Sequence, residues 1–128
     1  MNMTNIMLVF AGGGTGAVAR YLMALGVSRV TPGSNFPWHT LSINILGALG
    51  IGILLEILAL RMAMVAPMRL LLVTGFLGGF TTFSAFSLEA ALMLEKGAYT
   101  QMAAYIAASV IGTIAAVFIG SALVRSFS

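Results

Sequence analysis

The chain has 128 residues, of which 60% are hydrophobic and only 7% are charged, and its formal net charge is +3. Average soluble domains carry about 25% charged residues, so this composition excludes an ordinary soluble fold, and the scattered basic residues argue against nucleic-acid binding. The sequence has no cysteine, which excludes disulfides and thiolate metal sites. We therefore expect one transmembrane domain, residues 1–128, embedded in a lipid bilayer.

Four apolar segments are long enough to cross a bilayer, because a transmembrane helix needs about 20 such residues. They lie at about 6–27, 38–60, 68–94 and 99–124. The first is interpreted as a retained span and not as a signal peptide, because it lacks a basic start and contains Arg20 and five glycines. The short connections leave no soluble domain, so we expect an all-α membrane protein with four helices per subunit.

The basic residues of the connections fall almost evenly on the two sides of the predicted membrane. Arg61, Arg69 and Arg125 lie on the side of the N-terminus, and Arg29 and Lys96 lie on the other. The positive-inside rule therefore gives little preference for either orientation. Because four helices alone enclose little space, we expect an oligomer, and an antiparallel, dual-topology pair fits the weak charge bias.

Small and polar residues recur at intervals of four along three of the spans, so each set lies on one helix face. Small residues predict close packing between helices, whereas the polar stripes favour a path lined for water or ions over simple interhelical hydrogen bonds. The stripes are Gly12, Gly16 and Arg20; Thr40, Asn44, Ala48, Gly52 and Glu56; Ala104, Ala108, Gly112, Ala116 and Gly120; and Gln101, Tyr105, Ser109 and Thr113.

Ionisable residues within membrane spans are functional candidates by default. Arg20 is placed where its side chain reaches the far interface, and Glu56, near a helix end, is expected to reach water. Glu89 lies deeper. His39 follows Trp38 at an interface, where a hydrogen-bonded histidine is favoured over a switch or a ligand, and a second histidine for a metal site is lacking. The sequence shows no catalytic constellation, so we do not expect an enzyme.

The third span carries an unusual run, Gly75-Phe-Leu-Gly-Gly-Phe-Thr-Thr-Phe-Ser-Ala-Phe-Ser87. Glycines and hydroxyl residues weaken a helix, so we expect the helix to be broken over 75–82 and to resume at Phe83. Carbonyl groups freed by such a break can bind a cation such as Na⁺. Phe83 and Phe86 could turn their electropositive ring edges toward an anion, whereas packing is the favoured role for Phe76 and Phe80.

Three motifs resemble those of the Fluc family of fluoride channels, in family order and across all four spans. They are Gly13-Gly-x-x-Gly-Ala-x-x-Arg20, Thr40-Leu-x-x-Asn44-x-x-Gly47 and Thr74-Gly-Phe-Leu-Gly-Gly-Phe-Thr-Thr-Phe-Ser-Ala-Phe-Ser87. The third motif is very specific, and the first two would be weak alone. Ala85 departs from the pattern, because relatives often carry a hydroxyl there.

The resemblance implies an antiparallel homodimer in the cell inner membrane, with two fluoride pores and a structural Na⁺ on the dimer axis. Backbone carbonyls of Gly78 and Thr81 would hold the Na⁺. Arg20 matches the arginine of the first motif. Its charge would serve either the structure or the pore vestibule, and the resemblance does not decide between these roles. The residues that would line the pore are Asn44, Phe83, Phe86, Tyr105, Ser109, Thr113, Thr40 and Glu89.

The expected function is a passive, selective fluoride channel that lowers cytoplasmic fluoride by efflux and so gives fluoride resistance. The alternative is a small four-helix proton-coupled multidrug antiporter. That mechanism needs a deep carboxylate, which in the antiporter family lies in the first helix, and here only Glu89 could serve. A membrane interaction protein without transport would explain the glycine stripes but not the polar stripes or the break.

Overall fold

The computed structural model describes residues 2–61 and 66–128, and these fold into helices joined by short connections. Four apolar helical segments are long enough to cross a membrane, which confirms the four predicted spans to within three residues at each end. The elements are α1 (Met3–Val30), α2 (Trp38–Arg61), α3 (Ala66–Arg69), the π-helical segment η1 (Leu70–Leu77), α4 (Gly78–Phe80), α5 (Phe83–Glu95) and α6 (Tyr99–Ser126).

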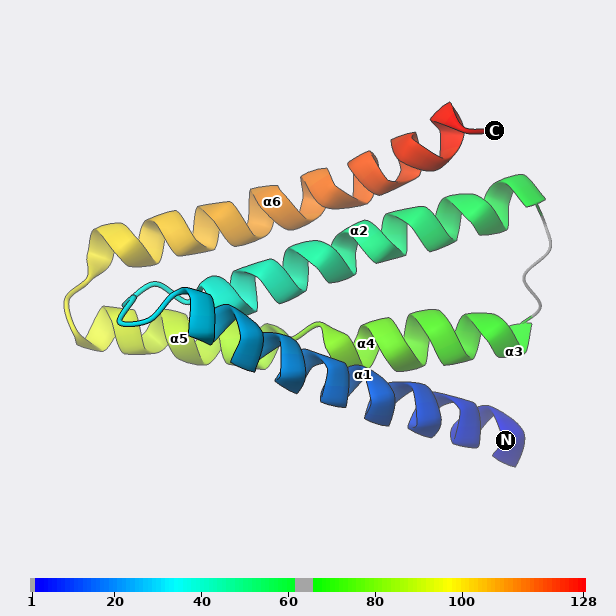
Figure 1. Ribbon diagram of the computed structural model, residues 1–128, viewed down its shortest axis with the longest axis horizontal. Coiled ribbons are helices and arrows are strands. Elements are labelled where there is room, and N and C mark those ends of the chain that lie inside the picture. The colour runs from blue at the N-terminus through cyan, green and yellow to red at the C-terminus, as the bar shows by residue number, and fades with distance from the viewer. Residues whose placement is uncertain (1, 62–65) are drawn as a thin grey trace.

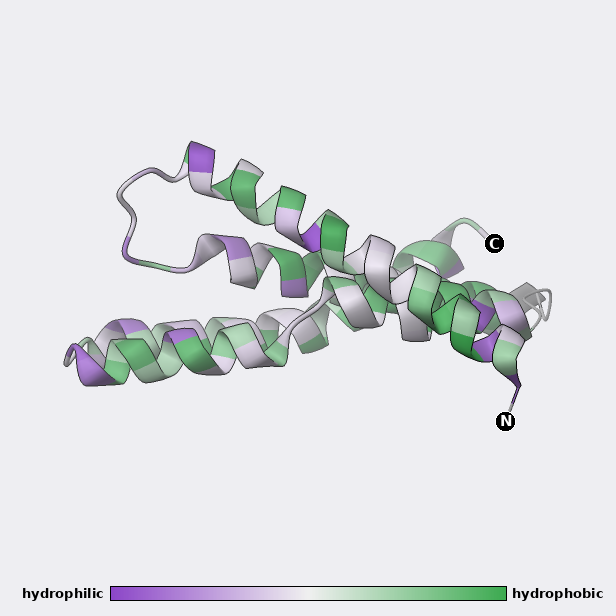
Figure 2. Ribbon diagram, turned by 90° about the horizontal axis from the view of Figure 1, so that it is seen from below, coloured by the Kyte–Doolittle hydropathy of each residue, from purple (hydrophilic) through white to green (hydrophobic). Residues whose placement is uncertain are grey.

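The helices form two main packing pairs, α2 with α6 and α1 with η1 and α4 (Figure 1). Both termini lie at one end of the molecule, and the α1–α2 and α5–α6 connections lie at the other. Hydrophobic residues run along the helices, and hydrophilic residues gather toward their ends and in the connections (Figure 2). Large apolar side chains such as Phe10, Ile111 and Phe118 are exposed, as expected of a surface that faces lipid.

Glycines bring the main chains of α1 and the third span into direct contact. A Cβ atom on Gly12 would overlap the carbonyl oxygen of Leu71 and lie 2.9 Å from the Cα atom of Gly75. A Cβ atom on Gly79 would likewise lie 3.0 Å from the Cα atom of Gly13. These contacts confirm that the small residues of the first span serve close helix packing.

The small faces of α2 and α6 meet in the same way. A Cβ atom on Gly120 would lie 3.0 Å from the main-chain nitrogen of Ile53, and the Ser121 hydroxyl donates to the carbonyl of Gly52 at 3.2 Å. Beyond this contact, the Arg125 guanidinium binds both carboxylate oxygens of Glu56, at 2.8 and 3.0 Å. The Glu56 side chain is partly exposed, and the structure adds an ion pair with the exposed Arg125 that the sequence did not indicate.

The break in the third span is confirmed, but it is shorter than predicted. Residues 75–80 stay helical, first as the wider π-helix of η1 and then as α4. Only Thr81 (φ −79°, ψ 156°) and Thr82 (φ −148°, ψ 124°) adopt extended backbone before α5 begins at Phe83. The glycines of this segment let α1 approach closely while the helix continues. The helix is therefore interrupted at Thr81 and Thr82 and not at the glycines.

Candidate ion pathway

The side chain of Asn44 binds the main chain of Thr82 at the break. Its Nδ2 group donates to the Thr82 carbonyl at 2.8 Å, and its Oδ1 atom accepts from the Thr82 N–H at 2.8 Å. The Thr82 hydroxyl in turn caps α5 by accepting from the N–H of Ala85 at 3.2 Å. Asn44 thus satisfies the backbone groups that leave the helix, as irregular backbone at membrane depth requires.

These bonds take two backbone N–H groups away from the carbonyl groups of Gly78 and Thr81, to which they would donate in a continuous helix. In an α-helix the N–H groups of Thr82 and Ala85 would donate to those carbonyls, four residues earlier. Here they bind the side chains of Asn44 and Thr82. The carbonyl oxygens of Gly78 and Thr81 are therefore released from their helical donors, and Gly78 is exposed on the surface of the subunit. Carbonyl oxygen suits Na⁺, so the donor set fits the expected cation.

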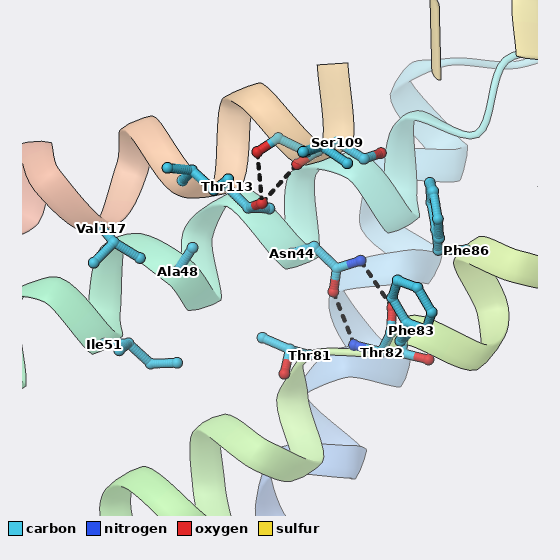
Figure 3. A pocket seen from close by; sticks show the side chains of 12 residues that line it. Asn44, Ala48, Ile51, Thr81, Thr82, Phe83, Phe86, Ser109, Thr113 and Val117 are labelled. Atoms are coloured by element: carbon cyan, nitrogen blue, oxygen red, sulfur yellow. Dashed lines mark hydrogen bonds between the residues drawn. The ribbon is translucent and has the colours of Figure 1, made fainter. Parts of the chain in front are cut away.

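A cavity of about 340 Å³ lies between α2, the break, α5 and α6 (Figure 3). Apolar residues of α2 and α6, among them Ala48 and Val117, form part of its wall, and Thr81 and Thr82 line it at the break. The cavity brings together five of the predicted pore residues, namely Asn44, Phe83, Phe86, Ser109 and Thr113. Residues from four segments of the chain thus converge on one space at the depth of the break.

The hydroxyl groups of α6 in this cavity differ in what they bind. The Thr113 hydroxyl donates to the carbonyl of Ser109, one turn earlier, at 2.6 Å. The Ser109 hydroxyl oxygen is buried and has no hydrogen-bond partner within the described part of the chain. Buried polar groups are nearly always paired, and Ser109 lines the cavity, so its unpaired hydroxyl is a candidate donor to a ligand there.

The two phenylalanines of α5 lie against each other at the cavity, with ring centroids 5.3 Å apart and planes inclined by 37°. The Phe83 ring is 78% exposed on the subunit surface. Phe86 also contacts the ring of Tyr105, at a centroid distance of 5.1 Å. Phe86 thus separates the cavity from a second polar group of residues.

This second group is built around the carboxylate of Glu89. The Thr40 hydroxyl donates to Oε1 at 2.8 Å, and the Tyr105 hydroxyl donates to Oε2 at 2.6 Å. The residues Thr40 and Tyr105 are 2% and 0% exposed. The Nε2 atom of His39 lies 3.1 Å from Oε1, a contact that the sequence did not indicate. The position of His39 next to Thr40 was the available signal, because consecutive residues at a helix start can reach one group.

A hollow of about 600 Å³ lies on the far side of Glu89, at the end of the molecule that holds the α1–α2 and α5–α6 connections. Figure 2 shows the paired ends of α1 and α2 diverging there from α5 and α6. We call this hollow the vestibule, and Glu89, His39 and Lys96 lie in its wall. Arg20, in contrast, is half-buried on α1 and lines neither the cavity nor the vestibule.

The predicted residues therefore fall into a sequence in space. The vestibule leads to Glu89 with Thr40 and Tyr105, the ring of Phe86 follows, and the cavity with Ser109 lies beyond it. This order describes a polar route from one end of the helices to the middle of the molecule.

Comparisons with known proteins agree with this arrangement. Residues 7–121 match the family described as "CrcB-like protein, Camphor Resistance (CrcB)". The chain is 52% identical to the fluoride-specific ion channel FluC of Agrobacterium fabrum, over 97% of this chain and 98% of that protein. It is 51% identical to FluC of a Caulobacter species, over 96% of each chain, and 47% identical to FluC of a Chelativorans species, over 97% of this chain and 98% of that protein.

These relatives are named as ion channels, which agrees with the expectation that the chain is not an enzyme. The matches cover the glycine-rich motifs, the break and the polar route, and they extend over nearly the whole chain. The resemblance to fluoride channels is thereby confirmed: the chain is a multi-pass membrane protein that belongs to the CrcB family of fluoride channels.

Proposed function

We propose that this protein is a passive, selective fluoride channel, and the observation that carries the proposal is the free hydroxyl of Ser109. A buried donor without a partner is costly in a bilayer, unless a passing ion or water accepts its hydrogen bond. Fluoride is small and a strong hydrogen-bond acceptor, so a site with free donors replaces part of its hydration shell.

The other groups of the cavity suit the same ion. The Nδ2 group of Asn44 carries two N–H bonds, and the Thr82 carbonyl accepts one of them, so the second is available toward the cavity. The ring edges of Phe83 and Phe86 supply weak positive potential. These donors are all neutral, so they favour entry of an anion without holding it for long, as conduction requires.

The active form in this proposal is an antiparallel homodimer with two pores, in the inner membrane of the cell. The cavity wall includes surface-exposed residues, with Phe83 78%, Ile114 55% and Val110 49% exposed. A second copy would cover these residues and close the cavity against lipid. The balanced basic residues of the two sides allow both orientations of the chain, which an antiparallel pair needs.

A structural Na⁺ at the dimer axis belongs to the same proposal. The carbonyl groups of Gly78 and Thr81 from both subunits would hold it, because the break redirects their helical donors. The ion would supply the positive charge that balances converging carbonyl dipoles. By binding one ion, these residues would hold the break of one subunit against the break of the other, while Phe83 and Phe86 remain free to line the pores.

The test is fluoride release from liposomes that contain the purified protein, driven by a fluoride gradient alone. A passive channel releases fluoride without a proton gradient and without a drug. The multidrug antiporter predicts proton flux that depends on an added cationic drug and that Glu89→Gln abolishes. Fluoride release that requires an imposed proton gradient would contradict the passive channel.

A further inference from the structure

His39 occupies the boundary between the vestibule and the polar route. It lies in the first turn of α2, its side chain is 37% exposed, and its Nε2 atom is 3.1 Å from the Glu89 carboxylate. The Glu89 side chain is 20% exposed, so this pair is accessible to water from the vestibule. An anion entering from this end passes the pair before it reaches Phe86.

The carboxylate of Glu89 presents a problem for an anion channel, because its negative charge repels fluoride at the entrance. Two of its three polar neighbours, Thr40 and Tyr105, are neutral hydroxyl donors that are almost fully buried. They hold the carboxylate in place but cannot cancel its charge. His39 is the remaining neighbour, and imidazole is the side chain that commonly gains a charge between pH 5 and 8.

Few other charged groups face His39 in the described part of the chain. Lys96, which follows α5, lines the same vestibule, and Tyr105 lies behind Glu89 on α6. The residues that α1, the α1–α2 connection and α6 contribute to the vestibule are uncharged, among them Ser28, Thr31, Ser34, Asn35 and Gln101. The local charge near the entrance therefore depends on Glu89, Lys96 and the protonation of His39.

We infer that His39 is a pH-responsive positioning residue that acts through Glu89 to control fluoride entry. Protonated His39 forms an ion pair with Glu89, cancels its negative charge and leaves Lys96 as the net charge of the vestibule, so fluoride enters faster. Neutral His39 leaves the carboxylate charge uncompensated, so entry is slower. This inference rests on the proposed fluoride channel and adds an acid-activated entrance to it.

The experiment compares fluoride efflux from liposomes at pH 7.5 and pH 5.5, with protein-free liposomes measured in parallel to subtract leakage of hydrogen fluoride. We expect the wild-type flux to be about threefold higher at pH 5.5 than at pH 7.5, because a factor of this size matches the typical strength of a partly exposed ion pair. His39→Gln keeps a neutral polar group beside Glu89, so its flux should stay near the wild-type value at pH 7.5 and lose the rise. His39→Lys should give high flux at both pH values.

Lys96→Gln is the matched control, because it removes a charge from the vestibule wall without changing His39 or Glu89. Its flux should fall by a similar factor at both pH values and keep the wild-type ratio. A pH ratio that persists in His39→Gln, or a wild-type ratio close to one, would overturn the inference while leaving the fluoride channel intact. Absence of fluoride flux at either pH would overturn the proposed function together with this inference.

Discussion

The Asn44 side chain and the Thr82 main chain form a closed pair of hydrogen bonds, with both donor–acceptor distances at 2.8 Å. An amide side chain can do this because it carries a donor and an acceptor in the geometry of a peptide group. The pair joins α2 to the break between α4 and α5. The pair therefore links two parts of the site. Asn44 lines the cavity, and the break at Thr82 releases the carbonyl groups of Gly78 and Thr81.

Replacing Asn44 by alanine should destabilise the break. Asn44→Ala leaves the N–H and carbonyl of Thr82 unpaired in the bilayer, so we expect the free energy of unfolding to fall by about 1–3 kcal/mol. Thermal unfolding in detergent measures this change. Thr15→Ala is the control, because the Thr15 hydroxyl binds only carbonyls of its own helix. Equal melting temperatures for Asn44→Ala and Thr15→Ala would contradict the structural role of Asn44.

Removing the Ser109 hydroxyl should separate conduction from stability. Ser109→Ala eliminates a donor to the ion but breaks no bond within the described chain, so we expect fluoride flux to fall about tenfold or more with unchanged thermal stability. Ser121→Ala, on the same helix, removes a hydroxyl that binds Gly52 and should leave the flux unchanged. A Ser109→Ala variant with wild-type flux would show that this hydroxyl does not contact the ion.

The aromatic pair should be needed for flux but not for folding. Phe83→Ile and Phe86→Ile keep an apolar side chain but lose the electropositive ring edge, so fluoride efflux should decrease while the protein stays folded and keeps the oligomeric state of the wild type. Phe76→Ile is the matched control, because Phe76 stacks on Phe80, 6.1 Å away, and does not line the cavity. The same flux in all three variants would exclude a pore role for Phe83 and Phe86.

The contact between α1 and the third span should tolerate no side chain at Gly12. Gly12→Ala forces a methyl group against the main chain of Leu71 and Gly75, which cannot rotate away, so we expect a loss of about 1–3 kcal/mol in stability. Gly14→Ala has open space around the added methyl group and should be neutral or slightly stabilising. Thermal unfolding of the two variants checks this difference, and comparable melting temperatures would refute the close packing.

Removing Na⁺ should weaken the dimer if the carbonyl site is structural. We expect that exchanging Na⁺ for a large organic cation during purification lowers the dimer fraction in size-exclusion chromatography with mass detection. Restoring Na⁺ should recover it, because the proposed site at the carbonyls of Gly78 and Thr81 would accept a small cation and not a large organic one. A dimer fraction that does not depend on the cation would argue against this site.

The spans and the chemistry of the polar route could be predicted from the sequence, because both depend on residue type and local spacing. About 20 consecutive apolar residues define a span wherever it lies, and the interval of four places Tyr105 and Ser109 on one face of α6. The extent of the break could not be predicted in this way. Local propensity marks Gly75 and Gly79 as weak points, but the contact with α1 keeps them helical.

The ion pairs between distant segments were also beyond sequence reasoning. Glu56 and Arg125 are 69 residues apart, and only the parallel packing of α2 and α6 brings them together (Figure 1). For His39 the sequence offered only its place at an interface and its position next to Thr40, and a hydrogen-bonded histidine was the favoured interpretation. The structure shows its neighbour to be Glu89, which depends on how the start of α2 meets α5. Such pairings follow from tertiary structure and not from periodicity.

The most direct test of the account is the selectivity of ion release from liposomes that contain the purified protein. Fluoride and chloride electrodes would record both ions in the same vesicles under equal gradients. We expect rapid fluoride efflux with chloride flux no greater than in protein-free vesicles, because a cavity lined by neutral hydroxyl and amide donors suits the smaller, stronger acceptor. Equal fluoride and chloride fluxes, or no fluoride flux, would contradict it.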